Sequence, residues 1–86
     1  MEFKKSNHIG KKYMVYYNNK WIHFGQLGYD QYEDRVPLKL YTHLNHYDKK
    51  RRASYLARAK GIRDGKGNLT WNNKNSPNYW AVNYLW

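Results

Sequence analysis

The sequence predicts a small α+β domain in which an N-terminal β-hairpin or short antiparallel sheet is packed by a central basic helix and a C-terminal helix. Alternating apolar residues flank an Asn-Asn pair near the N-terminus. Two later segments begin with helix-capping residues and continue with apolar residues at helical spacing. A chain of 86 residues makes one domain and buries only a modest core.

The predicted hairpin has alternating strands at residues 12–17 and 21–24, joined by the turn Asn18-Asn19. Asn tolerates the positive φ that a two-residue hairpin turn requires. This turn fixes the register and creates two cross-strand pairs on the expected core face, Tyr13–Phe24 and Val15–Ile22. Residues 1–11 are polar and basic, and we expect them to form a flexible arm outside a domain of residues 12–86.

The other face of the hairpin carries the pairs Met14–His23 and Tyr16–Trp21. Two interpretations apply to Tyr16 and Trp21. They form a platform on which nucleic-acid bases stack, or another segment of the chain covers them.

The central helix is predicted between Asp48, a good N-cap, and Gly61, a favourable left-handed C-cap. Its core-facing residues recur at i, i+3, i+4 and i+7, namely Arg52, Tyr55, Leu56 and Ala59, with Ile62 just beyond. Four basic residues, 49–52, crowd the first turn, where the helix dipole disfavours positive charge. A polyanion at this turn would face both backbone N–H groups and basic side chains. The alternative is a solvated helix face.

The C-terminal helix is predicted from Ser76 as N-cap and Pro77 as first helical residue. Its apolar stripe consists of Pro77, Trp80, Ala81, Tyr84 and Leu85. We expect the chain end at Trp86 to be packed on the core.

The composition points to a polyanionic partner, because the net charge is +10 and the pI is near 9.9. Nucleic acid is the first candidate and an anionic membrane surface the second. Aromatic residues make up 19% of the chain, which favours a folded domain over a disordered tail. The absence of cysteine excludes disulfides and thiolate zinc sites. We find neither an apolar signal-peptide core nor an apolar run of the ~20 residues that a spanning helix needs, so we expect a protein that is not secreted.

Catalytic and metal-binding interpretations depend on acidic and histidine residues. Asp30, Glu33 and Asp34 are either salt-bridge partners of nearby basic residues or carboxylates for metal and acid–base chemistry. His43 and His46 are three residues apart, a spacing that can place two ligands on one metal. Asp48 is close to them, but without cysteine the remaining ligands would have to be distant His or carboxylate residues, so we predict no metal, no cofactor and no catalytic residue. We expect His46 to act through a hydrogen bond at the Asp48 cap.

Several spaced residues carry a family resemblance. They are Phe24-Gly25, Gly28-Tyr29, Tyr32 and Asp34-Arg35, then His46, Asp48, Arg51-Arg52, Tyr55 and Arg58, and finally 67–70, Ser76, 79–81 and 84–86. Across residues 12–86 their order resembles a family of small basic proteins of large nucleocytoplasmic DNA viruses, the relatives of mimiviruses and phycodnaviruses. In that family a His often follows the Arg that corresponds to Arg58, whereas Ala59 occupies the place here, which weakens a catalytic role that depends on such a His. The resemblance implies a viral origin and a virion or virus-factory setting in the host cytoplasm, but no activity.

The sequence therefore predicts a non-enzymatic nucleic-acid-binding protein with little sequence specificity, and DNA is favoured over RNA. The residues expected to bind nucleic acid are Lys49, Lys50, Arg51, Arg52, Arg58, Lys60, Arg63, Tyr16 and Trp21. The alternative is a small structural virion or minor capsid protein that contacts acidic virion proteins. A further alternative is a nuclease-like enzyme that uses His43 and His46.

Overall fold

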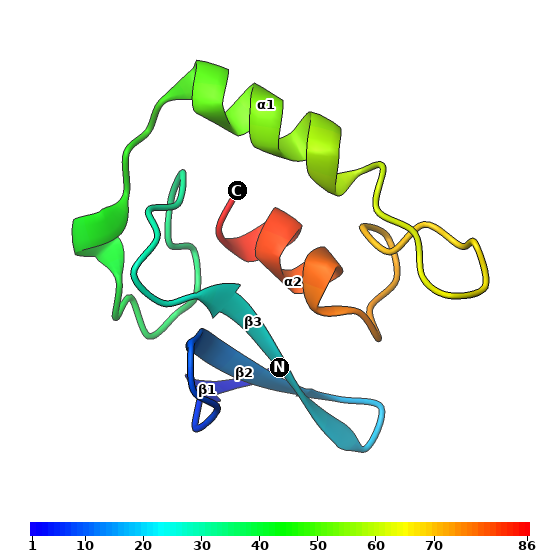
Figure 1. Cartoon of the computed structure of the whole chain (residues 1–86). Helices are drawn as coiled ribbons and strands as arrows, with labels where there is room; N and C mark the ends of the chain where they lie inside the picture. The colour runs from blue at the N-terminus through cyan, green and yellow to red at the C-terminus, as the bar shows by residue number, and fades with distance from the viewer.

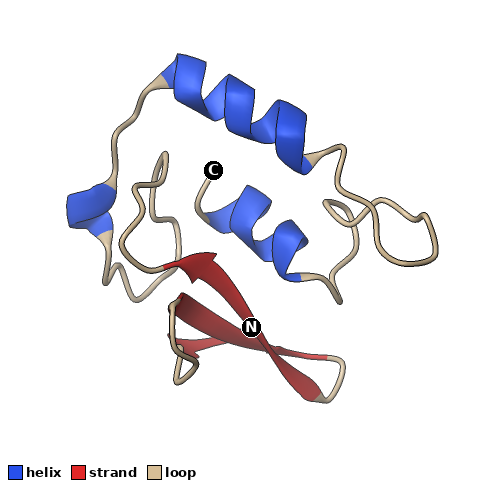
Figure 2. Cartoon of the chain, viewed as in Figure 1, coloured by secondary structure: helices blue, strands red, loops and turns tan.

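The computed structural model describes residues 1–86 and has an α+β fold, with a three-stranded antiparallel sheet and two α-helices (Figures 1 and 2). The elements are β1 (Glu2–Lys5), β2 (Lys11–Tyr17), β3 (Lys20–Gln26), the 3-10 helix η1 (Thr42–Leu44), α1 (Lys49–Ala59) and α2 (Pro77–Tyr84). The strands follow the order β1-β2-β3. α2 lies between the sheet and α1, so the fold has three layers (Figure 1).

The predicted hairpin register is confirmed. Asn18 and Asn19 have φ of 53° and 63°, as a type I′ turn requires. The four predicted pairs form, namely Tyr13–Phe24, Val15–Ile22, Met14–His23 and Tyr16–Trp21. Tyr13, Val15, Ile22 and Phe24 are all buried in the core.

The N-terminal segment differs from the prediction of a flexible arm. Residues 2–5 form β1, which pairs with β2 and places Phe3 opposite Val15. The Phe3 ring lies 6.3 Å from the ring of Phe24 and 4.9 Å from that of Tyr84, measured between centroids. A single aromatic residue in a polar segment gives no periodic signal, yet it anchors this edge strand on the core.

α2 is the central helix of the fold. The Ser76 hydroxyl accepts the Asn78 N–H, and Pro77 occupies the first turn, as predicted. Trp80, Ala81 and Val82 are buried along its length, and Leu85 is buried at its C-cap. The predicted stripe is wrong for Pro77, which is exposed, and it omits Val82. Val82 is buried in addition to the stripe because this helix packs on the sheet on one side and on α1 on the other.

α1 packs on α2 through one face only. The four predicted core-facing residues are the ones that are not exposed, namely Arg52, Tyr55, Leu56 and Ala59. The C-terminal prediction is wrong in two respects. Gly61 does not have a positive φ, because the helix ends at Lys60 in a right-handed conformation. Ile62, expected to extend the stripe, is half exposed because the chain turns away there.

Candidate nucleic-acid interface

A cleft of about 680 Å³ lies between α1 and the end of β3 with the loop that follows. One wall is a single flank of α1, because residues four and seven positions apart share a helix face. We call this wall the cleft flank; it consists of Lys50, Arg51, Ser54, Tyr55 and Arg58. The facing wall includes Lys11, Gln26, Tyr29 and Asp30. The floor includes Phe24, Ala81, Leu85 and Trp86.

The cleft is strongly positive. Five basic side chains line it, against the single carboxylate of Asp30. That carboxylate lies 3.7 Å from the Arg51 guanidinium, and both side chains are about half exposed. An exposed ion pair of this kind is weak and yields readily to another anion. Lys11, Lys50 and Arg58 have no side-chain hydrogen bond or ion pair, so their charges are free for a ligand.

Lys12 also borders the cleft, but its ammonium group is already used. It donates to the Tyr29 carbonyl at 2.6 Å and to the side-chain oxygen of Gln31. Burial lowers the pKa of Lys12 to about 8, although the carboxylates of Asp34 and Asp30 oppose this shift. Lys12 therefore holds the loop in place beneath the cleft, and sequence alternation gave no sign of its burial.

Of the predicted α1 residues, the structure brings Lys50, Arg51 and Arg58 together in the cleft. Lys49 and Lys60 are exposed on the other flank of the helix, which also carries Ala53. We call these three residues the outer flank. The cleft flank thus presents three positive charges and the outer flank two.

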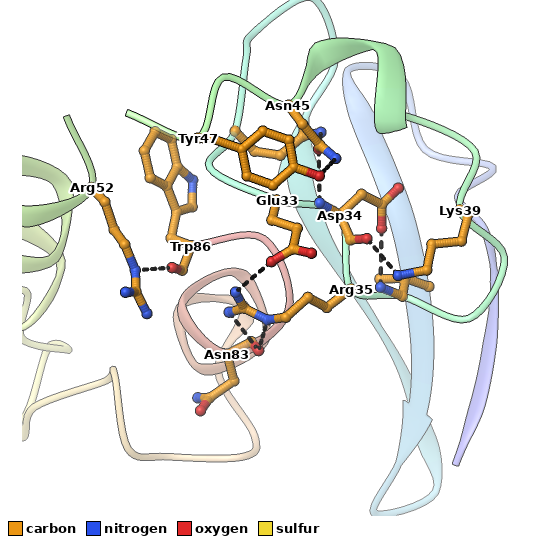
Figure 3. Close-up of polar contacts among 11 residues, drawn as sticks. Glu33, Asp34, Arg35, Lys39, Asn45, Tyr47, Arg52, Asn83 and Trp86 are labelled. Atoms are coloured by element: carbon orange, nitrogen blue, oxygen red, sulfur yellow. Dashed lines mark hydrogen bonds and ion pairs between the residues drawn. The ribbon is translucent and has the colours of Figure 1, made fainter. Parts of the chain in front are cut away.

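Arg52 and Arg63 have structural contacts instead. The Arg52 side chain donates from Nε to the Trp86 carbonyl at 2.7 Å (Figure 3), and its guanidinium lies 4.8 Å from the Tyr32 ring centroid. Arg63 donates to the Gly67 carbonyl within its own loop. Arg52 therefore fastens the C-terminus to α1, a role that follows from its place on the core-facing stripe.

The first turn of α1 is less open to anions than the sequence indicated. The Asp48 carboxylate accepts the backbone N–H groups of Lys50 and Arg51 at 2.9 and 3.2 Å. Two of the backbone donors expected to face a phosphate are therefore occupied. Anion binding at this helix depends on side chains.

Tyr16 and Trp21 lie on the sheet face opposite α2, separated from α1 by two layers of the fold. Their rings meet edge to face, with centroids 5.2 Å apart, and Tyr16 is 44% exposed. The Lys4 ammonium lies 5.4 Å from the Trp21 ring centroid. The pair is thus not joined to the cleft, and the same short segment of nucleic acid does not reach both.

The same sheet face carries a pair of histidines that the sequence analysis did not single out. The His8 and His23 rings stack with centroids 3.4 Å apart, and the Ser6 hydroxyl lies 2.7 Å from Nδ1 of His23. Burial lowers the pKa of His23, and the charges of His8 and Lys11 act in the same direction. The hairpin register predicted that His23 lies on this face. The position of His8 could not be predicted, because it depends on β1.

His43 and His46 do not share a site. His43 is exposed in η1, whereas His46 Nδ1 accepts the Asp48 N–H at 2.9 Å, which confirms the expected hydrogen bond at the cap. His46 Nε2 is buried without a partner. No three His, Cys, Asp or Glu side chains in the chain are grouped to hold a metal ion.

The acidic residues act as structural partners. Asp34 is buried, and its carboxylate accepts the Tyr13 hydroxyl and the N–H groups of Val36 and Tyr41. Glu33 lies 3.9 Å from Arg35, whose guanidinium also donates to the carbonyl of Asn83 near the end of α2 (Figure 3). The Arg35 contact holds the segment after β3 against α2, and the Asp34 carboxylate holds the same segment against β2.

Comparison with known proteins gives one match. A family described as a family of unknown function (DUF5754) matches residues 1–35, which contain all three strands and stop before η1. No curated protein and no solved structure matches the chain. Neither α-helix is long and apolar enough to cross a membrane.

Proposed function

We propose that this protein binds nucleic acid, with DNA as the first candidate, by contacting phosphates through the cleft flank of α1. The observation that carries the proposal is the convergence of Lys50, Arg51 and Arg58 with Lys11 on one cleft. Their only carboxylate neighbour is Asp30, in an exposed ion pair. Side chains placed in this way contact phosphate oxygens, which carry no sequence information. The binding is therefore expected to show little sequence specificity.

The charge of the whole molecule supports the same proposal. A net charge of +10 on 86 residues attracts a polyanion from a distance, and the free charges of the cleft then provide direct contacts. The outer-flank residues Lys49 and Lys60 add to the long-range attraction without lining the cleft. This difference between the flanks provides a matched control.

The test is a binding titration with a short DNA duplex across a salt series. Log K is expected to fall with log[salt] by about 0.9 per phosphate neutralised. The double variant Arg51→Ala/Arg58→Ala is expected to flatten the slope by up to about two. The control Lys49→Ala/Lys60→Ala removes the same charge from the outer flank and is expected to change the slope less. Equal slopes for the wild type and the folded cleft variant would refute the proposal.

The viral setting and a structural role in the virion remain predictions that rest on the sequence resemblance alone. Recovery of the protein from purified particles would support them. A nuclease-like activity has less support, because His46 is engaged in the cap of α1 and His43 lies apart from it.

A further inference from the structure

We infer that the cleft holds an unpaired nucleotide, so that the protein prefers single-stranded to double-stranded nucleic acid. This inference rests on the proposed function and adds the class of ligand. Three features of the cleft support a single nucleotide as its ligand: its composition, its size and the polar groups left free inside it.

The composition of the cleft changes from rim to floor. The rim carries the free charges of Lys11, Lys50 and Arg58, which match a phosphate. Tyr55 on the cleft flank and Trp86 on the floor are partly exposed, and their rings match the apolar face of a base and contribute nothing to a phosphate contact. A duplex hides its base faces inside the stack and presents phosphates, so only an unpaired nucleotide uses both parts of the cleft.

The aromatic side chains of the cleft strengthen this match. Tyr55 stacks on Trp86 with ring centroids 4.1 Å apart and an interplanar angle of 9°. Both residues line the cleft, and the Arg52 bond to the Trp86 carbonyl fixes the position of the Trp86 backbone. A pre-ordered aromatic wall lowers the entropy cost of binding a base.

The size of the cleft also favours a single nucleotide or two. Its volume of about 680 Å³ lies within the range of about 300–1,000 Å³ that is usual for small-molecule sites. The whole protein is only 22 Å across in its shortest dimension, which is about the width of a double helix. A duplex therefore rests on the rim and cannot enter.

Two polar side chains are free to contact the edge of a base. The Ser54 hydroxyl and the Gln26 amide line opposite walls of the cleft, and neither makes a side-chain hydrogen bond within the protein. The Asn78 amide, by contrast, already donates to Ala59 and Thr70. Ser and Gln side chains both donate and accept, so this site accommodates several bases.

The test fills the cleft without removing charge. Ser54→Phe places a ring at an exposed helix position in the cleft flank, and Ala53→Phe places the same ring on the outer flank. The probes are a short oligothymidylate and a DNA duplex of equal length, both titrated at the same salt concentration. The wild type is expected to bind the single strand more tightly than the duplex.

Ser54→Phe is expected to weaken binding of the oligothymidylate by about tenfold, the loss that corresponds to one base stack, and to weaken duplex binding by a smaller factor. Ala53→Phe is expected to leave both affinities unchanged. Single-strand affinity that is equal in Ser54→Phe and the wild type would overturn the cleft inference while leaving the phosphate-binding proposal intact. A wild type that binds neither probe in a salt-dependent manner would overturn both.

Discussion

The two helices of this fold have the same kind of N-cap but differ in how deeply they are buried. Asp48 caps α1 and Ser76 caps α2, each through a side-chain oxygen that accepts first-turn N–H groups. α2 is then covered on both sides and carries the fully buried Trp80, whereas α1 buries only Ala59 completely. In this small domain, therefore, one helix packs into the core and the other presents a charged surface.

The charges follow the same division. α2 contains no charged residue, while α1 contains five among its eleven. A helix so rich in positive charge gains little stability from its own sequence, because the basic side chains of its first turn are repelled by the positive end of the helix dipole. Its position is fixed instead by contacts with α2 and by the Arg52 bond to the C-terminus. Stability and binding are therefore separable by mutation.

The largest expected effect is on the core helix. Trp80 is fully buried and donates from Nε1 to the Lys74 carbonyl at 2.8 Å. Trp80→Ala is expected to lower the free energy of unfolding by about 3–5 kcal/mol, enough to unfold a domain with little core to spare. Leu56→Ala, at a half-buried position of α1, is expected to cost about 1–2 kcal/mol. Chemical denaturation of both variants measures the difference, and similar losses would show that the helices contribute equally.

A smaller effect is expected at the N-cap of α1, where two substitutions of Asp48 distinguish its hydrogen bonds from its negative charge. Asp48→Ala removes two accepted hydrogen bonds and is expected to cost about 0.5–2 kcal/mol of stability. Asp48→Asn keeps a good cap and is expected to be close to wild type in thermal unfolding. Both variants remove a negative charge from the N-terminus of α1, two residues from the cleft residue Lys50, so both are expected to bind DNA more tightly at low salt. Weaker binding by the well-folded Asn variant would contradict the placement of phosphate near this turn.

The smallest expected effect is a pH dependence at the same cap. Burial and the nearby Arg51 lower the pKa of His46 in the fold, although Asp48 and Asp30 oppose them. Because the unfolded chain then binds more protons, stability is expected to fall as the pH decreases through the ordinary value of about 6.5. Protonation also removes the Nδ1 acceptor of the Asp48 N–H. His46→Gln is expected to show a shallower fall between pH 7 and 5, with the remainder due in part to His23, whose pKa is lowered as well. If the pH dependence of stability is unchanged in this variant, His46 is excluded as its cause.

The parts of the fold that local rules govern were predicted from the sequence. Asn18-Asn19 specified the turn and with it the register, and Ser76-Pro77 specified the start of α2. The missed features depend on contacts between distant residues. Phe3 packs against the core only because β1 pairs with β2, and Lys12 is buried only because the loop after β3 folds over it.

The candidate site was predicted only in part, because the placement of its side chains also depends on contacts between distant residues. Charge alone pointed to the basic residues of α1 but could not divide them between two flanks. That division depends on α2, which orients α1 so that Arg51 and Arg58 face the end of β3. Arg52 was included with the ligand-binding residues although its place on the apolar stripe already indicated an inward contact.

The most direct test of the central proposal is a map of amide chemical-shift changes on titration with a short oligothymidylate. We expect the largest changes in the cleft, at residues 50–58 of α1 and at Lys11, Gln26 and Tyr29 on the facing wall, and small changes at the outer sheet face. Changes concentrated at Tyr16, Trp21 and His23, with α1 unaffected, would contradict the proposal and place binding on the opposite side of the molecule.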